Sequence, residues 1–188
     1  MGKHYSKAFA PLLGGNTPPI AIGLHRFSKG AEGHLYQTTR DRPFASPQNS
    51  MTHYQQILRL PTTGKSLSKI TFKVQSVVAE SRVQTGLCTV FLRHTSASLL
   101  IQENADPDVL TDLENFFAKL VPEWGNYIHS TEGPDDMPAH IRTALTSTSE
   151  QIPIANGRLL LGTWQGIYLW EHRQHNHTRE VVVHVMGD

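Results

Sequence analysis

Apolar and polar residues begin to recur with a regular period after about residue 50. Residues 70–77 (ITFKVQSV) alternate apolar and polar side chains, which predicts a half-buried strand. Residues 86–94 (GLCTVFLRH) are apolar almost throughout, which predicts a central strand ending at His94. Residues 96–103 (SASLLIQE) predict another short strand.

The clearest helical pattern covers residues 106–122 (DPDVLTDLENFFAKLVP). Asp106 is suited to cap this helix, and Pro107 fits its first turn. The predicted apolar face consists of Val109, Leu110, Leu113, Phe116, Phe117 and Leu120. A second helix is predicted from about Met137 to Leu145, with Asp135 or Asp136 as its cap.

The end of the chain returns to strand patterns. Residues 157–172 predict two strands around a turn at Gly162–Gly166, and residues 179–186 (REVVVHVM) predict the last strand. Strands grouped around two main helices, without regular alternation of strand and helix, favour an α+β fold. We expect mixed or antiparallel sheets in a layered, β-sandwich-like arrangement.

Residues 1–50 differ in composition from the rest and predict a low-complexity, largely disordered extension before a domain at residues 51–188. They contain six glycines and five prolines, and six Lys or Arg against two acidic residues. The start MGKHYSK also fits the pattern for myristoylation of Gly2. Membrane association through Gly2 is therefore an alternative to a cytoplasmic location, and a mitochondrial presequence is less favoured because the first 25 residues lack arginine.

Composition narrows the class of protein. The formal net charge is +1, which gives no global field for nucleic acid or a membrane surface. Cys88 is the single cysteine, so no intramolecular disulfide can form and a reducing cytoplasmic compartment is the natural fit. Its apolar surroundings favour a small buried side chain over a nucleophile. No run approaches the roughly 20 apolar residues of a membrane-spanning helix.

Eight histidines follow residue 50, and several stand where a predicted element begins or ends. His94 ends a strand, His129 lies in a loop, His140 lies early in a helix, and His172 ends another strand. Imidazoles brought together in this way, with one open position, would hold a catalytic zinc or similar ion. Their spacing matches no short metal signature, so unrelated polar histidines remain the alternative.

Other residues have a functional and a structural interpretation. Glu132 is a candidate base or metal partner of His129, or an exposed loop carboxylate. Arg142 and Arg173 are candidates for gripping a phosphate, or for ion pairs with nearby acids. In GTWQG, the glycines would let a ligand approach the backbone closely, and Thr163 and Gln165 would offer it hydrogen bonds. The spacing of these residues does not decide between ligand binding and a structural role.

Three blocks make the domain recognisable: HTSASLLIQENADPDV (94–109), GNYIHSTEGPDDMPAHIR (125–142) and LGTWQGIYLWEHR (161–173). Together they resemble the YjbQ-like family, whose members are often named secondary thiamine-phosphate synthases. The resemblance covers about residues 51–188 and implies an α+β fold with a β-sandwich-like core, assembled as a homotrimer. It also implies one site built from His94, His129, His140 and His172.

The activity that the resemblance implies is weak and secondary: hydroxymethylpyrimidine diphosphate is joined to thiazole phosphate to give thiamine phosphate. A histidine cluster suits zinc or another transition ion, whereas diphosphate chemistry favours magnesium, which prefers oxygen ligands. This mismatch fits a side activity of a site that was built for another reaction.

Three functional hypotheses therefore stand. The first is a thiamine-phosphate-synthase-like transferase, with Arg142 and Arg173 on the phosphates. The second is a metal-dependent hydrolase or lyase on a small, phosphorylated metabolite, with His129, His140 and His172 as metal ligands and with His94, Glu132 or His140 as catalytic groups. The third is a non-catalytic trimeric module that binds a small ligand.

Overall fold

The computed structural model describes residues 51–188. Its first and last strands, β1 (Thr52–Thr63) and β8 (Asn176–Gly187), pair antiparallel along their whole length, from Thr52 opposite Gly187 to Thr63 opposite Asn176. The predictions made for residues 1–50, including their disorder and the acylation of Gly2, lie outside the described residues.

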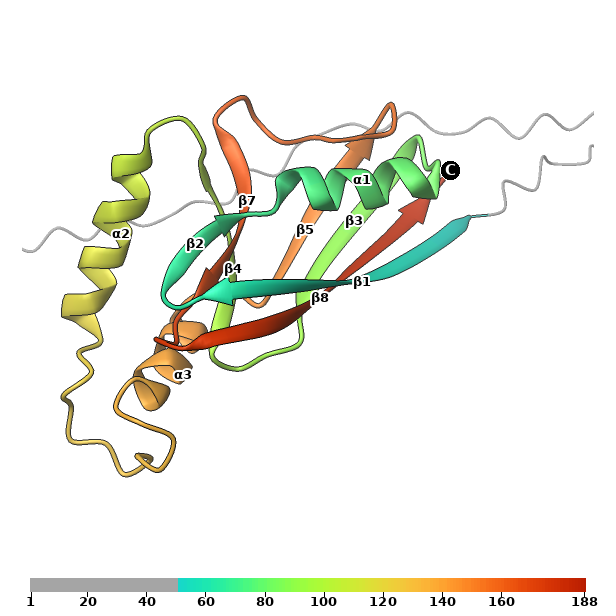
Figure 1. Cartoon of the computed structure of the whole chain (residues 1–188). Coiled ribbons are helices and arrows are strands. Elements are labelled where there is room, and N and C mark those ends of the chain that lie inside the picture. The colour runs from blue at the N-terminus through green and yellow to red at the C-terminus, as the bar shows by residue number, and fades with distance from the viewer. Residues whose placement is uncertain (1–50) are drawn as a thin grey trace, which may run out of the picture. The chain divides into compact units, whose positions relative to one another are not determined.

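Two antiparallel sheets make up the framework (Figure 1). The larger has the strand order β1-β8-β3-β5-β6 and is completed by β3 (Thr85–Leu92), β5 (Ser149–Ala155) and β6 (Arg158–Leu159). The smaller has the order β2-β7-β4, with β2 (Ser66–Lys69), β7 (Gln165–Glu171) and β4 (Ala97–Glu103). Every strand pair in both sheets is antiparallel.

One hydrophobic core joins the two sheets to a helix. Val181, Val183 and Val185 alternate along β8 and are fully buried, as the period of two in a strand requires. They share the core with residues of the smaller sheet, such as Leu99, and with residues of helix α1, such as Val77. The α+β class and the sandwich-like arrangement of the sheets are thus confirmed, with antiparallel pairing throughout.

Residues 70–77 form a helix, so the strand predicted there is wrong. Helix α1 (Thr71–Ser81) buries Val74, Val77, Val78 and Ser81, which are spaced as one face of a helix. Phe72, expected to share a strand face with Val74, is 81% exposed. The alternation in the eight-residue window was short enough to be accidental, whereas the helical period holds over the following turns. The domain therefore has three helices rather than two.

The two predicted helices are present. Helix α2 (Pro107–Leu120) begins as expected, since the Asp106 side chain accepts a hydrogen bond from the backbone N–H of Asp108 at 2.9 Å. Residues 51–188, however, leave the apolar face of α2 largely uncovered: Phe116 is 59% and Leu120 is 54% exposed. Figure 1 shows α2 standing beside the sheets, before a long loop leads to helix α3 (Asp136–Leu145).

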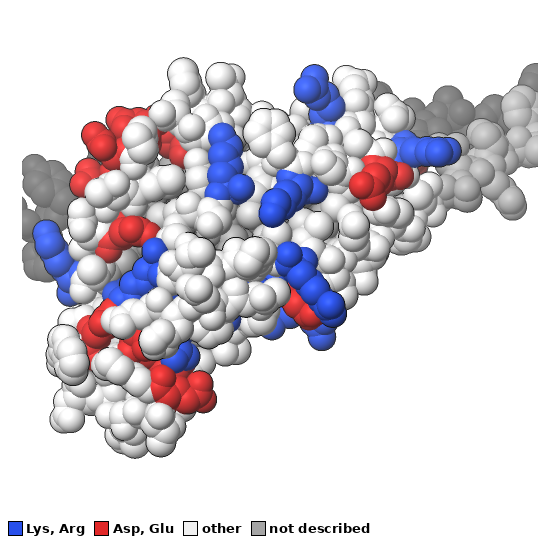
Figure 2. Space-filling model, in the orientation of Figure 1, with Lys and Arg blue, Asp and Glu red and all other residues white. Residues whose placement is uncertain are grey.

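The composition can be compared with the structure in three respects: surface charge, the hydropathy of the helices and the burial of Cys88. Basic and acidic side chains are interspersed on the face shown in Figure 2 rather than gathered by sign. Within residues 51–188, no helix is long and apolar enough to cross a membrane. Cys88 is fully buried, and burial raises the pKa of its thiol to about 12, as expected of a packing residue.

Candidate metal centre and adjoining cleft

The start of α3 brings a carboxylate and two imidazoles together. Asp136 and His140 lie one turn apart on the same face of the helix. His129 reaches them from the loop before α3. Its Nε2 lies 2.7 Å from Asp136 Oδ2, and His140 Nε2 lies 3.4 Å from the same oxygen. One ligand atom from each of the three residues lies within 4.8 Å of the others, as binding of a single metal ion requires.

A backbone carbonyl orients the imidazole of His140. His140 Nδ1 lies 2.9 Å from the carbonyl oxygen of Thr95, which can only accept a hydrogen bond. The proton of the neutral ring is therefore placed on Nδ1, and the Nε2 lone pair is left facing Asp136. Metal-binding histidines are commonly held in this way, with the second ring nitrogen donating to a carbonyl or carboxylate.

Arg173 holds the carboxylates at the start of α3. Its Nη1 contacts Asp136 Oδ1, and its Nε donates to Asp135 Oδ2 at 3.0 Å. Asp135 Oδ2 also accepts from the backbone N–H of Gln174 at 2.8 Å. Burial alone would raise the pKa of Asp135, but the N–H of Gln174 and the Arg173 guanidinium outweigh it and lower that pKa.

Two interpretations made from the sequence are corrected by these contacts. Asp135 stands at the N-cap position of α3 but makes no side-chain capping bond, because its carboxylate is turned to Arg173. Arg173 is buried and already bonded to Asp135, Asp136 and the carbonyl oxygen of Glu132. It is therefore placed to fix the cluster rather than to grip a phosphate, and the ion-pair alternative holds for this residue.

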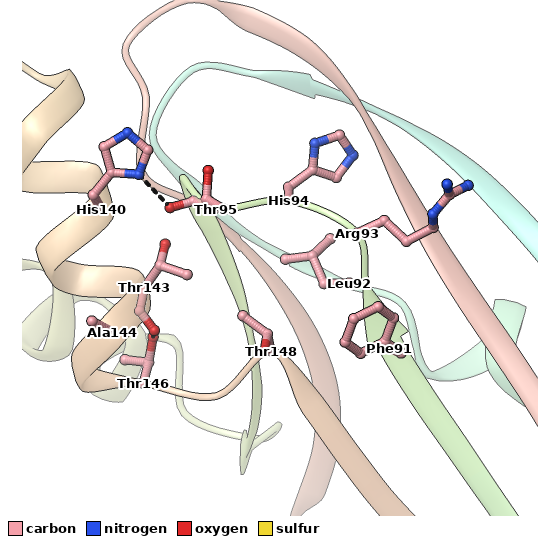
Figure 3. Close-up of a pocket in the computed structure, with 10 residues that line it drawn as sticks. All are labelled: Phe91, Leu92, Arg93, His94, Thr95, His140, Thr143, Ala144, Thr146 and Thr148. Atoms are coloured by element: carbon pink, nitrogen blue, oxygen red, sulfur yellow. Dashed lines mark hydrogen bonds between the residues drawn. The ribbon is translucent and has the colours of Figure 1, made fainter.

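A cleft of about 680 Å³ adjoins His140. Its walls come from the end of β3, the turn that follows it and the outer face of α3, including Phe91, Arg93, Thr143 and Thr146. Figure 3 shows the imidazoles of His94 and His140 on either side of Thr95 along the rim. The structure therefore brings two of the four predicted histidines to one cleft and places His129 beside one of them.

His94 is held by the backbone of β8. Its Nε2 accepts the backbone N–H of Glu180 at 2.8 Å. Partial burial, followed by the positive charge of Arg179, lowers the pKa of His94. His94 is thus a neutral ring in the wall of the cleft, and one of its nitrogens is already engaged.

His172 lies outside the cluster of His129, Asp136 and His140. It is 1% exposed, its Nε2 lies 2.9 Å from the hydroxyl of Ser98, and its Nδ1 has no partner among residues 51–188. Burial, and then the charge of Arg142, lower the pKa of His172 to about 3. The predicted three-histidine ligand set is replaced here by two histidines and one aspartate.

Glu132 lies beside the cluster. Its side chain is 67% exposed, and its Oε2 lies 3.8 Å from Arg173 Nη1, the nitrogen that also contacts Asp136. Arg142 is buried in a separate cavity between α2 and α3.

Thr163 and Gln165 lie in the turn that leads into β7, seven or more residues from His172 at its other end. At ~3.3 Å per residue, a strand separates such positions by roughly 23 Å. Their backbone carbonyls accept from the Asn104 side chain, and Gln165 Oε1 accepts the N–H of Gly162 at 2.8 Å. The structure gives these two residues a place in a turn, away from the cluster.

Asp136 is the site residue that the sequence interpretation missed, since it had been assigned to helix capping. The signal was present in the spacing: Asp136 and His140 are four residues apart in a predicted helix, which places them on one face. The role of the Thr95 carbonyl has no side-chain signal and could not have been found this way.

Comparison with known proteins shows the family to which this chain belongs. Residues 56–188 match the family model described as "UPF0047 protein YjbQ-like". The chain belongs to the YjbQ-like family. It is 71% identical to the UPF0047 protein sll1880 of Synechocystis, over 72% of this chain and 92% of that protein. It is 43% identical to the YjbQ protein of Escherichia coli O157:H7, over 72% and 99% of the two chains.

Solved YjbQ-like structures share the fold. An uncharacterised YjbQ/UPF0047 protein from Clostridium acetobutylicum is 41% identical and superposes with a TM-score of 0.61, covering 68% of this chain and 96% of its own. A YbjQ-like protein of unknown function from Sulfolobus solfataricus, at 23% identity, gives a TM-score of 0.69 over 73% and 99% of the two chains. Family membership thus establishes the fold without stating an activity.

Proposed function

We propose that this YjbQ-like chain is a metal-dependent hydrolase that acts on a small, phosphorylated metabolite in the cleft between β3 and α3. The observation that carries the proposal is the cluster of His129, Asp136 and His140, with ligand atoms within 4.8 Å of one another, beside a cleft of about 680 Å³. A cluster at the surface with no adjoining cleft would not support a reaction.

The donor set suits a transition ion such as zinc. Two imidazoles and one carboxylate are a ligand set of zinc hydrolases, in which three protein ligands leave a position open for water or substrate. The contact of His140 Nδ1 with the Thr95 carbonyl and the contact of Arg173 with Asp136 Oδ1 are the outer contacts that such sites need. When bound, the ion would supply Lewis-acid chemistry toward water or a substrate oxygen.

Three residues around the cluster have further roles: Arg173, Glu132 and His94. Arg173 contacts Asp136 Oδ1, which leaves Asp136 Oδ2 facing the histidines. Glu132 has an exposed carboxylate 3.8 Å from Arg173 Nη1, the nitrogen that contacts Asp136. We assign Glu132 the role of general base. His94 lines the same cleft as His140, and its ring is held in the wall, because Nε2 accepts from the backbone N–H of Glu180 and Nδ1 lies 3.5 Å from Arg179 Nη1.

The hydrolase hypothesis is favoured over the other two by specific contacts. A thiamine-phosphate-synthase-like transferase would need cations on a diphosphate, and Arg173 is already committed to Asp135 and Asp136. A non-catalytic module would favour a metal fully enclosed by protein, whereas His129 and His140 are partly exposed beside a cleft.

The metal content of the untagged protein is the first test. We expect one zinc or similar ion per chain in the wild type, and loss of at least nine-tenths of it in the His129→Ala/His140→Ala variant. The matched control is His175→Ala/His177→Ala, with His175 just before β8 and His177 near its start, which should keep the ion. A metal-free wild type, or a double variant that keeps its metal, would remove the metal centre.

Activity is the second test. Phosphate monoesters and carboxylic esters should be screened with metal-loaded wild type and with Glu132→Gln. We expect turnover of a phosphate monoester that is lost with the metal and reduced about 10²-fold or more in the Glu132 variant, as loss of a general base predicts. Formation of thiamine phosphate from the two synthase substrates, with no hydrolysis of any ester, would favour the transferase instead.

A further inference from the structure

A second, smaller cavity of about 210 Å³ lies between α2, α3 and the end of β7. Its walls include Lys65, Glu114, Asn115, Arg142 and Trp170. A water molecule occupies ~30 Å³ in the liquid, so this volume has room for a small molecule. None of the three residues of the metal cluster lines it.

Arg142 is the unusual residue in this cavity. It is 6% exposed, and its Nη2 donates to the carbonyl oxygen of Val121 at 3.0 Å. Its Nε is buried without a hydrogen-bond partner, and no carboxylate of residues 51–188 forms an ion pair with its guanidinium. A buried cation without a counter-charge is costly, because burial removes the water that would otherwise solvate it.

We infer that this cavity is a binding site for a small oxyanion, a phosphate or carboxylate group that pairs with the fork of Arg142. The guanidinium lines the cavity and presents parallel N–H groups of a geometry that matches both kinds of oxyanion. The ligand would bond directly to the guanidinium, which no carboxylate of residues 51–188 does, although Glu114 lines the same cavity.

The other walls of the cavity fit such a ligand. Lys65 adds a second positive charge; its ammonium is paired with Glu123 outside the cavity walls and has further N–H groups to donate. Burial, and next the positive charge of Arg142, lower the pKa of Lys65, as expected where two cations share a space. Asn115 offers an amide donor, and the Trp170 ring offers an apolar surface for the rest of the molecule.

Two carboxylates also lie in the walls. Glu171 is already neutralised, since Arg179 donates to its oxygens at 2.5 and 2.6 Å and Thr62 donates at 2.8 Å. Glu114 has no such partner among the described residues and competes with the ligand for the positive charges. Its removal should therefore strengthen binding, which distinguishes this site from a general attraction to positive surface.

The site is separate from the metal centre. Arg142 and His140 are two residues apart in α3, and with 3.6 residues per turn their side chains point about 200° apart around the helix. The inference therefore does not depend on the proposed metal or on the proposed hydrolysis.

Calorimetric titration of the untagged full chain tests the inference, with inorganic phosphate and with acetate as probes at constant ionic strength. We expect one binding event per chain for at least one probe, weakened tenfold or more in Arg142→Met and strengthened threefold or more in Glu114→Gln. His140→Ala should leave the affinity unchanged. Tighter binding of phosphate than acetate would assign the ligand to phosphate esters, and the reverse order to carboxylates.

Three results would overturn the inference: no binding of either anion to the wild type, equal binding in Arg142→Met, or loss of binding in His140→Ala. The last result would mean that the probe binds at the metal centre. If Arg142→Met does not fold, Lys65→Met takes its place, with weaker binding expected there and stronger binding in Glu114→Gln. Unchanged affinity in both of those variants would also overturn the inference.

Discussion

At the scale of single residues, Arg173 connects the fold to the proposed site. Its guanidinium bridges Asp135 and Asp136, and all three side chains are buried. Removing one partner from a buried ion pair leaves an uncompensated charge, which costs far more than the pair itself contributes. The two carboxylates would then repel each other at the point where α3 begins.

We predict that Arg173→Met lowers the free energy of unfolding by about 3–5 kcal/mol, the range for a broken buried pair. Urea unfolding at pH 7 measures the change. The matched control is Arg59→Met, because Arg59 is 76% exposed in its ion pair with Glu180 and such pairs contribute about 0–1 kcal/mol. Equal losses in the two variants would show that Arg173 does not act through the buried carboxylates.

His172 makes the stability depend on pH. The pKa of its buried ring is lowered to about 3, from 6.5 for an ordinary histidine, through burial and the charge of Arg142. Between these two pH values the unfolded chain takes up a proton that the folded chain does not. The contribution of His172 to stability is therefore complete above pH 6.5 and is lost progressively as the pH falls toward 3.

We predict that the free energy of unfolding of wild type carries a component of up to about 1.4 kcal/mol per pH unit from this one proton. Urea unfolding of wild type and His172→Gln at pH 7, 6 and 5 isolates it. Between pH 7 and pH 5, the free energy of unfolding of His172→Gln should fall less steeply with pH than that of wild type, by up to about 1.4 kcal/mol per pH unit. This difference in slope does not depend on the stability of the variant at pH 7. Parallel pH profiles for the two proteins would contradict the assignment.

At the scale of elements, α1 offers a direct test of the corrected secondary structure. In a strand, Phe72 and Val74 would point to the same face, whereas in α1 Val74 is fully buried and Phe72 is 81% exposed. We predict that Val74→Ala costs about 1.5–3 kcal/mol of unfolding free energy, from two lost methyl groups and the cavity they leave.

Phe72→Ala should change the free energy of unfolding by less than ~0.5 kcal/mol, as substitutions at exposed positions usually do. Denaturant unfolding of both variants is sufficient. Similar large costs at the two positions would restore the strand interpretation of this segment.

Local pattern predicted the elements whose burial follows a simple period. The strands at β3, β4 and β8 and the helices α2 and α3 were predicted from it, and Asp106 was recognised as a cap. β1, β2 and β5 were not predicted: β1, for example, is exposed along most of its length and is defined by its pairing with β8 rather than by its own pattern. Such pairing joins residues more than 100 positions apart, which no local window contains.

The site was predictable to a similar degree. His129 and His140 were named as candidate ligands and lie together in the structure, and Asp136 was recoverable from its spacing to His140. The roles of Arg173 and the Thr95 carbonyl depend on how distant segments meet around the start of α3. For Arg142 the sequence left phosphate binding and an ion pair open, and the structure shows a buried guanidinium that forms no ion pair with a carboxylate of residues 51–188.

At the scale of the whole molecule, the exposed apolar side chains on α2 require a cover. Phe116 and Leu120 are 59% and 54% exposed, although the pattern of α2 has a clear apolar face. Phe117 of the same helix packs edge-to-face on Trp170. An amphipathic helix whose apolar face is exposed is unfavourable in water and typical of an interface.

We expect the chain to form the homotrimer that the resemblance to the YjbQ-like family implies, with α2 at the contact between copies. Light scattering coupled to size-exclusion chromatography should give three times the mass of the chain. Phe116→Glu/Leu120→Glu should reduce it to the monomer mass, because an interface cannot bury two unpaired carboxylates without a large cost. Thr111→Glu/Asp112→Gln, two exposed polar positions of α2, is the matched control and should stay trimeric. A monomeric wild type would leave α2 to another partner, and a trimeric Phe116/Leu120 variant would move the interface to a different surface.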